Sequence, residues 1–255
     1  MHAFSVFGRD LRQQYLAQLL QDSGYPVIHT TDEIRFLPTV LLPVPTILAD
    51  GTVNGTTSDL QNFLASVPAN TTIWGSGLES DRNQAAERGV ILKNYSDFPD
   101  FAEKNAHLTA EGALQIALDR LPQTIARSHF LVIGYGRIGK KLAAMLSALG
   151  GIVTIASRTA QNVPYRVDRT GAYQYPLTDY DAIFNTVPAP VLSASHPIKK
   201  DCLLVDLASS PGGIEKSSNR TVLHALGLPA KTAPKTAAEI MLSVVLSEME
   251  ESHAT

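Results

Sequence analysis

The chain has 255 residues, a hydrophobic fraction of 44% and a charged fraction of 18%, which is enough to bury the cores of two domains. Its formal net charge of −3 provides no basic footprint for nucleic acid. The single cysteine, Cys202, excludes an internal disulfide framework, and we find neither a membrane-span pattern nor a signal-peptide pattern. We therefore expect a cytoplasmic protein of a reducing compartment.

Short apolar runs alternate with helical patterns through the first hundred residues. We expect strands over residues 3–7, 26–29, 39–42, 72–74 and 90–92, and helices over residues 11–19 and 84–88. Gly24 ends the first helix, and residues 43–45, Pro-Val-Pro, break the third strand into a turn. Strands that alternate with helices predict a parallel open sheet.

A long helix follows a polar and irregular stretch at residues 94–107. Thr109 has the chemistry of its N-cap and Pro122 stops it. Between these two residues, apolar side chains recur at helical spacing, at Ala110, Leu114, Ala117 and Leu121. A long helix in this place commonly bridges two domains, and we expect the boundary near residue 108.

The next stretch combines a strand, a glycine-rich turn and a helix. Residues 130–133 form a short apolar run, and Gly134, Gly136 and Gly139 follow in the spacing G-x-G-x-x-G, before an apolar helical stripe. These glycines permit a tight turn, approach of the backbone to a pyrophosphate and close packing of helix on strand, in that order. The pattern predicts a dinucleotide site at the helix start. The alternative is a tight β-turn-α unit with no ligand.

Ser157, Arg158 and Thr159 follow the next strand, over residues 152–156. An NAD site usually carries an acidic residue here to bind the ribose 2′-hydroxyl, and none is present. Hydroxyl groups and a guanidinium suit a 2′-phosphate, so NADP is favoured over NAD. The alternative is that Arg158 is a solvated arginine that discriminates little between the two cofactors.

Two further apolar runs, residues 181–187 and 202–207, are expected strands whose loops line the cofactor near its nicotinamide. The predicted cofactor-binding residues are Gly134, Tyr135, Gly136, Arg137, Ile138, Gly139, Ser157, Arg158, Thr159, Thr186, Val187, Pro188, Leu207, Ala208 and Ser209. Residues 228–233 are expected to form a last short strand. Thr236 then opens a helix over residues 236–251 whose apolar stripe needs a partner surface.

The predicted fold class is α/β with two domains. A C-terminal Rossmann domain, with a doubly wound parallel sheet, spans residues 109–235 together with the bridging helix. An N-terminal flavodoxin-like α/β domain spans residues 1–108, and we expect the helix at 236–251 to pack back on it, leaving a cleft between the domains.

A nicotinamide cofactor beside a second domain suggests hydride transfer, with a substrate held by polar groups. Arg9, Asp10 and Arg12 stand where the first strand turns into its helix, so an anion there would meet a helix N-terminus and a counter-charge. Lys231 and Lys235 are two further candidates for a carboxylate. The alternatives are a capping Asp10 and solvated basic side chains.

The sequence shows no metal-ligand spacing and no nucleophile–base order. The histidines are scattered singly, and His107 and His224 are weak candidates for a general base. We therefore assign no catalytic residue and no metal site.

Several motifs resemble the A subunit of dipicolinate synthase over most of the chain. They are Gly8-Arg9-Asp10-Leu11-Arg12-Gln13, Leu42-Pro43-Val44-Pro45 with Asp50-Gly51, Thr109-Ala110-Glu111-Gly112-Ala113, Asn185-Thr186-Val187-Pro188-Ala189, residues 206–213 and residues 228–237. The last three are the specific part, because the glycine fingerprint is common to many dehydrogenases. Arg9 departs from the family pattern, which usually has glycine there.

This resemblance implies NADP-dependent oxidation of dihydrodipicolinate to dipicolinate in the mother cell of a sporulating bacterium. It also implies a flavoprotein-like partner, the B subunit of dipicolinate synthase, and we expect a homo-oligomer. Two alternatives stay open: another NADP-linked dehydrogenase that acts on a 2-hydroxy or 2-oxo acid, and a non-catalytic NADP-binding subunit.

Overall fold

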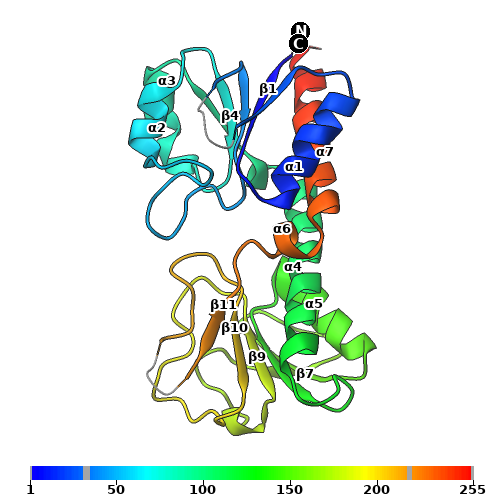
Figure 1. The fold of residues 1–255 in the computed structure, drawn as a ribbon. Helices are drawn as coiled ribbons and strands as arrows, with labels where there is room; N and C mark the ends of the chain where they lie inside the picture. Colours follow the sequence, from blue (N-terminus) through cyan, green and yellow to red (C-terminus); the bar gives the residue numbers. More distant parts are fainter. Residues whose placement is uncertain (1, 31–34, 217–219, 254–255) are drawn as a thin grey trace. The chain divides into compact units, whose positions relative to one another are not determined.

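The computed structural model describes residues 2–30, 35–216 and 220–253. The chain forms two compact units (Figure 1). Unit 1 contains Met1–Asn105 and Pro229–Thr255, and unit 2 contains Ala106–Leu228. The expected boundaries were near residues 108 and 235. Each unit is described by itself below.

Unit 1 is built on a five-stranded parallel sheet. Its strands are β1 (Phe4–Phe7), β2 (Val27–Thr30), β3 (Thr39–Leu41), β4 (Thr72–Gly75) and β5 (Ile91–Asn94), in the order β2-β1-β3-β4-β5. This order, 2-1-3-4-5, is that of flavodoxin-like sheets, and it reverses between β1 and β3. The carboxyl ends of these two strands are where such folds place a ligand.

Helices cover both faces of this sheet. They are α1 (Leu11–Asp22), α2 (Leu60–Ser66), α3 (Arg82–Glu87) and α7 (Pro234–His253). α7 packs against α1 through its apolar stripe, so the last part of the chain completes the first unit (Figure 1). On the other side, Phe7 and Phe36 stack and Phe63 packs edge-on against both, with ring centroids 5.7–5.9 Å apart. Burial of these rings fixes the sheet between its two helical layers.

Unit 2 contains a six-stranded parallel sheet. Its strands are β6 (His129–Ile133), β7 (Ile152–Ala156), β8 (Arg166–Asp168), β9 (Ala182–Asn185), β10 (Leu203–Asp206) and β11 (Val222–His224), in the order β11-β10-β9-β6-β7-β8. From the other edge this is the order 3-2-1-4-5-6 of the Rossmann fold, with its switch point between β6 and β9. The predicted fold class is therefore confirmed.

The two faces of this sheet are covered differently. α5 (Arg137–Ala148) and the second half of α4 (Pro99–Arg120) bury one face in a core that includes Phe130, Leu142 and Phe184. Loops and the short 3₁₀ helix η3 (Leu177–Asp179) cover the opposite face, where Leu192 and Ile214 pack on the strands. Connections without regular helices therefore surround the carboxyl end of the second half of the sheet.

Two expectations for secondary structure were wrong. The stretch 94–107 is not irregular throughout, because α4 begins at Pro99, a residue favoured in the first helical turn, and Thr109 lies inside the helix. Residues 228–233 form helix α6 (Leu228–Thr232) instead of a strand. Pro229 cannot donate to a strand ladder, whereas its fixed φ suits a helix start.

Candidate functional site

The glycine-rich turn joins β6 to α5 at the switch point of unit 2. Gly134 has a φ of +95°, and a Cβ there would overlap the Thr186 hydroxyl and lie 2.9 Å from Val187 Cγ2. A Cβ at Gly139 would overlap the carbonyl oxygen of Gly134. A side chain is therefore excluded at both positions, by the turn and by the close packing of α5 on β6.

The second glycine of the fingerprint has a different environment. Gly136 is the N-cap of α5, and a Cβ built there would meet no described atom within 4 Å. This open space lies at the start of a 12-residue helix whose first N–H groups need an acceptor. Tyr135 and Arg137 flank it, Tyr135 half-buried and Arg137 exposed. The turn fits a pyrophosphate group.

Ser157 lies at the carboxyl end of β7, where the ribose of a bound dinucleotide is read. It is 8% exposed, and its Oγ accepts hydrogen bonds from Thr159 N at 3.2 Å and Ala160 N at 3.1 Å. The lone pairs of the hydroxyl are therefore used, and only its hydrogen is left to offer to a ligand. Arg158 and Thr159 are exposed beside it.

Asn185 and Asp206 end the strands β9 and β10, and they are partners in the register of the sheet. Both are buried, and Asn185 Nδ2 donates to Asp206 Oδ1 at 2.8 Å. The predicted cofactor residues 186–188 and 207–209 follow directly. Our sequence analysis did not single out this pair, although a polar residue that ends each of two buried apolar runs was the available signal.

Thr186 connects the first of these loops to the strand that precedes the glycine turn. Its backbone N–H and its hydroxyl both donate to Ile133 O, at 2.8 and 2.9 Å. The loop after β9 and the end of β6 are thus fixed to each other. The four groups of predicted cofactor residues, which follow β6, β7, β9 and β10, therefore lie at one edge of the sheet of unit 2.

Farther along the same two loops is a pocket of about 430 Å³, which is lined by residues 190–193, His196 and residues 211–215. His196 Nδ1 accepts from Ser193 N at 3.0 Å, and Glu215 Oε2 accepts from Ala194 N at 2.7 Å. These polar groups therefore stabilise the loop that carries them. The described residues hold no group of three or more His, Cys, Asp or Glu side chains arranged for a metal ion.

The predicted substrate residues near the chain start lie at the switch point of unit 1. Asp10 is the N-cap of α1 and accepts from Gln13 N at 3.0 Å. Arg12 is 2% exposed; its Nη2 donates to Val44 O at 2.6 Å and lies 3.6 Å from Asp10 Oδ2. Burial lowers the pKa of Arg12, and Asp10 opposes this effect. Arg9, in contrast, is exposed.

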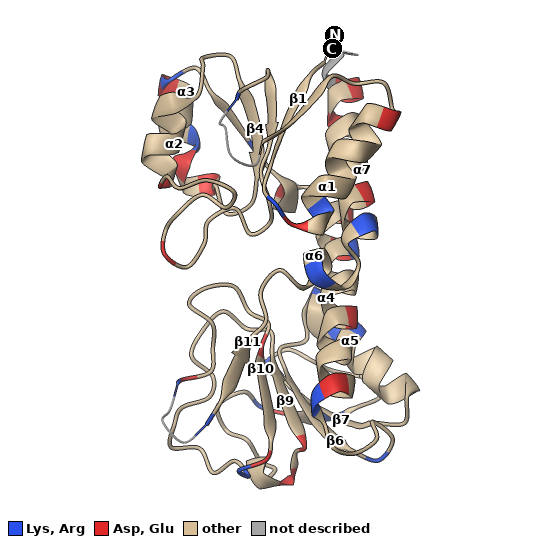
Figure 2. Ribbon diagram, in the orientation of Figure 1, with Lys and Arg blue, Asp and Glu red and all other residues tan. Residues whose placement is uncertain are grey.

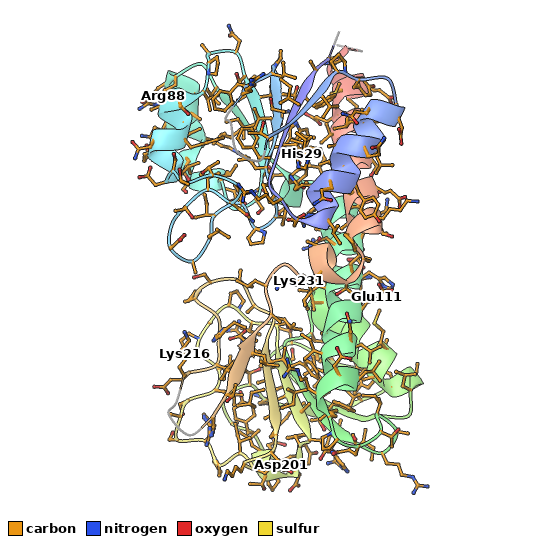
Figure 3. The ribbon with its side chains drawn as sticks, viewed as in Figure 1. His29, Arg88, Glu111, Asp201, Lys216 and Lys231 are labelled. Atoms are coloured by element: carbon orange, nitrogen blue, oxygen red, sulfur yellow. The ribbon has the colours of Figure 1, made fainter. Side chains whose placement is uncertain are left out.

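The two lysines also belong to unit 1. Lys231 lies on α6 (Figure 3) and Lys235 in the first turn of α7, and both side chains are exposed. Figure 2 shows basic residues in blue on α6. Of the two histidines considered for catalysis, His107 pairs with Glu111 at 3.3 Å on the surface of α4, and His224 is exposed at the end of β11. Neither is held in a buried polar site.

The fold and the glycine turn place the protein in the class of two-domain α/β proteins that carry a Rossmann domain of the dinucleotide-binding type. No family model matches the chain. The A subunit of dipicolinate synthase from Bacillus subtilis (strain 168) is 30% identical over 247 residues, covering 88% of this chain and 82% of the relative. The chain therefore belongs to the family of dipicolinate synthase A subunits.

Two solved structures of dipicolinate synthase A subunits have a similar fold. The A subunit of dipicolinate synthase from Bacillus halodurans has a TM-score of 0.79 at 23% identity, with 96% of this chain and 97% of that chain covered. The A chain of dipicolinate synthase from Bacillus subtilis has a TM-score of 0.77 at 26% identity, with 99% and 97% covered. The likeness of fold thus extends over both units.

Proposed function

We propose that the protein is an NADP-dependent dehydrogenase that oxidises dihydrodipicolinate to dipicolinate. The observation that carries this proposal is that the chain belongs to the family of dipicolinate synthase A subunits. Its glycine turn agrees with this, because Gly134 and Gly139 have no room for a side chain and the space at Gly136 is open. Loss of a hydride to the cofactor and of a proton to the medium balances the reaction and makes the ring aromatic.

The environment of Ser157 supports NADP. A dianionic 2′-phosphate only accepts hydrogen bonds, whereas a 2′-hydroxyl both donates and accepts. Ser157 has only its hydroxyl hydrogen to offer, because Thr159 N and Ala160 N already donate to its oxygen. Arg158 adds a positive charge with no acidic residue next to it in the turn.

We further propose that basic side chains of unit 1 bind the two carboxylates of the substrate. Arg9 is exposed at the switch point of the sheet, and Lys231 and Lys235 are exposed on α6 and α7. Asp10 and Arg12 serve this site indirectly, because their bonds to Gln13 and Val44 hold the turn that presents Arg9.

The residues of this chain contribute orientation more than acid–base chemistry. A bound nicotinamide supplies the hydride acceptor. The start of α5 binds the pyrophosphate, the turn at Ser157 holds the ribose, and the loops after β9 and β10 place the nicotinamide end. Because aromatisation of the ring drives the oxidation, fixing the substrate against the acceptor accounts for most of the catalysis required.

The decisive experiment is an assay of the purified chain with dihydrodipicolinate generated in situ and either NADP⁺ or NAD⁺. We expect dipicolinate absorbance and cofactor reduction to rise together, and faster with NADP⁺. Equal rates would contradict the argument from Ser157. Tight NADP binding without product would favour a non-catalytic subunit or another substrate, such as a 2-hydroxy or 2-oxo acid.

The relative is named as the A subunit of a synthase, which supports a further proposal. The protein works with a B subunit in the mother-cell cytoplasm, as a homo-oligomer. Size-exclusion chromatography of the chain alone and with its co-expressed partner tests the assembly. Within the described residues, no helix has both the length and the apolar character needed to cross a membrane.

A further inference from the structure

We propose that Asn185 and Asp206 are a positioning pair that shapes the nicotinamide half of the cofactor site without touching the cofactor. The inference rests on the proposed nicotinamide cofactor. Asn185 and Asp206 belong neither to the glycine fingerprint nor to the predicted substrate residues, so the inference gives these two buried polar side chains a role of their own. The pair acts through its hydrogen bonds to the loops after β9 and β10.

The carboxylate of Asp206 accepts four hydrogen bonds, one from Asn185 at the end of β9 and three from the loop after β10. Oδ1 accepts from Asn185 Nδ2 at 2.8 Å and from Ala208 N at 3.1 Å. Oδ2 accepts from Gly213 N at 2.8 Å and from Ile214 N at 3.1 Å. A carboxylate has about four lone-pair sites, so this one has no acceptor site left for a substrate proton. Asp206 is therefore excluded as the general base, although it directly precedes the predicted cofactor residues 207–209.

Asn185 extends the same network to the loop after β9. Its side-chain oxygen accepts from Val187 N, and its Nδ2 donates to Val187 O, both at 2.9 Å. Asn185 and Asp206 thus connect Val187, which is predicted to line the cofactor, with the backbone of residues 208, 213 and 214. Moving one loop would break bonds to the other.

The glycines of the second loop are fitted to this network. A Cβ at Gly212 would lie 2.7 Å from Asp206 Oδ2. A Cβ at Gly213 would lie 2.6 Å from Ala189 O and 2.7 Å from Val187 O. The two loops therefore touch through backbone atoms, and even a methyl group would separate them.

Because the network lies in the second half of the sheet, we expect it to affect binding of the nicotinamide and not of the adenosine. In a Rossmann fold the first half, here β6 to β8, holds the adenosine, and the second half holds the nicotinamide. Asp206 ends a strand of the second half. Asp168 is the counterpart of Asp206 in the first half of the sheet. It ends β8, and like Asp206 it is 1% exposed. Its carboxylate accepts hydrogen bonds from Arg169 N, Gln174 N and Tyr175 N. Asp168 O also accepts from Ser157 N at 3.0 Å, which connects it to the ribose turn.

The test compares a whole cofactor with its adenosine half. Binding of NADPH and of 2′,5′-ADP is measured by calorimetry for the wild type and for Asp206→Asn, Asn185→Ala and Asp168→Asn. Asp206→Asn replaces one carboxylate oxygen by an amide NH2, which cannot accept, and leaves two of the four donors unsatisfied. We expect about a tenfold or greater loss of NADPH affinity with 2′,5′-ADP affinity unchanged within about twofold. Asn185→Ala removes the connection between the loops but keeps the carboxylate and its three backbone donors, so it carries the test if Asp206→Asn does not fold.

The control, Asp168→Asn, removes the same chemistry from the adenosine half, and we expect it to weaken both ligands. Unchanged NADPH affinity in the two pair variants, or an equal loss for both ligands, would overturn the positioning role. A wild type that binds neither ligand would refute the proposed cofactor, and with it this inference. A wild type that binds both ligands, with pair variants that do not differ from it, would refute this inference alone.

Discussion

Replacement of Ser157 by aspartate should reverse the cofactor preference. The aspartate oxygen can accept from Thr159 N and Ala160 N as the serine oxygen does, because both residue types cap such turns. The change then adds one negative charge beside the ribose without removing a turn hydrogen bond. Its effect on the 2′-phosphate is electrostatic.

The size of this effect follows from the position. Two unit charges about 4 Å apart repel by about 4 kcal/mol at an effective dielectric constant near 20. The neighbouring side chains of Arg158 and Thr159 are exposed, so salt and water reduce the repulsion, and we expect about 2 kcal/mol, or roughly a 30-fold loss in NADPH affinity. A carboxylate that accepts from a 2′-hydroxyl should strengthen NADH binding by about fivefold.

The assay is fluorescence titration of NADPH and NADH with the Ser157→Asp protein at two salt concentrations. Arg158→Gln separates the contribution of the positive charge and should weaken NADPH while NADH stays unchanged. Arg88→Gln removes one charge from an exposed position in unit 1, the C-cap of α3 (Figure 3), and should change neither. Equal losses for NADPH and NADH in Ser157→Asp, or no change in either, would refute this account of the turn.

Three further changes test other parts of the structure. Gly139→Ala should abolish NADPH binding and lower the free energy of unfolding by about 1–3 kcal/mol, measured by urea denaturation, because the methyl group would overlap Gly134 O; a variant that binds normally would contradict the packing. Tyr95→Phe should leave that free energy unchanged or raise it by up to about 1 kcal/mol, because Tyr95 Oη is buried without a hydrogen-bond partner among the described residues; a clear loss would reveal a missing partner. Burial raises the pKa of Cys202 to about 12, so its thiolate fraction at pH 8 is below that of an ordinary thiol, and alkylation of the folded protein by iodoacetamide should be at least about tenfold slower than in urea; equal rates would place the thiol in solvent.

The sequence predicted the parts of this fold that depend on local chemistry. The glycine spacing, the apolar run before it and the helical stripe after it located β6 and α5, because turn geometry and periodicity are local properties. The short strands β8 and β11 were missed. Each has three residues and lies at an edge of the sheet, so its burial pattern is too brief to show a period.

The candidate site was predictable to a similar degree. Ser157 and Thr186 could be predicted to lie near each other, because strand ends in a parallel sheet meet at one edge. The burial of Arg12 was not predicted, because its partner Val44 lies 32 residues away in the sequence. The network of Asp206 was missed for the same reason: its donors are Asn185, 21 residues away at the end of β9, and backbone groups of the loop after β10, and only the fold shows that these segments meet.

The α-helices of unit 2 cover only one face of its sheet, and this explains why Asp168 and Asp206 are both buried at strand ends. On the face without helices, long connections must be held by something other than helix packing. Asp168 and Asp206 each bind several backbone N–H groups of the connection that follows their strand. An ionised carboxylate that accepts backbone N–H groups makes stronger hydrogen bonds than a neutral acceptor, so two acidic side chains fix loops that an apolar contact alone would leave free to shift. On this reasoning the order of this edge of the sheet depends on carboxyl groups at strand ends, and the unit can omit helices there without losing ordered loops.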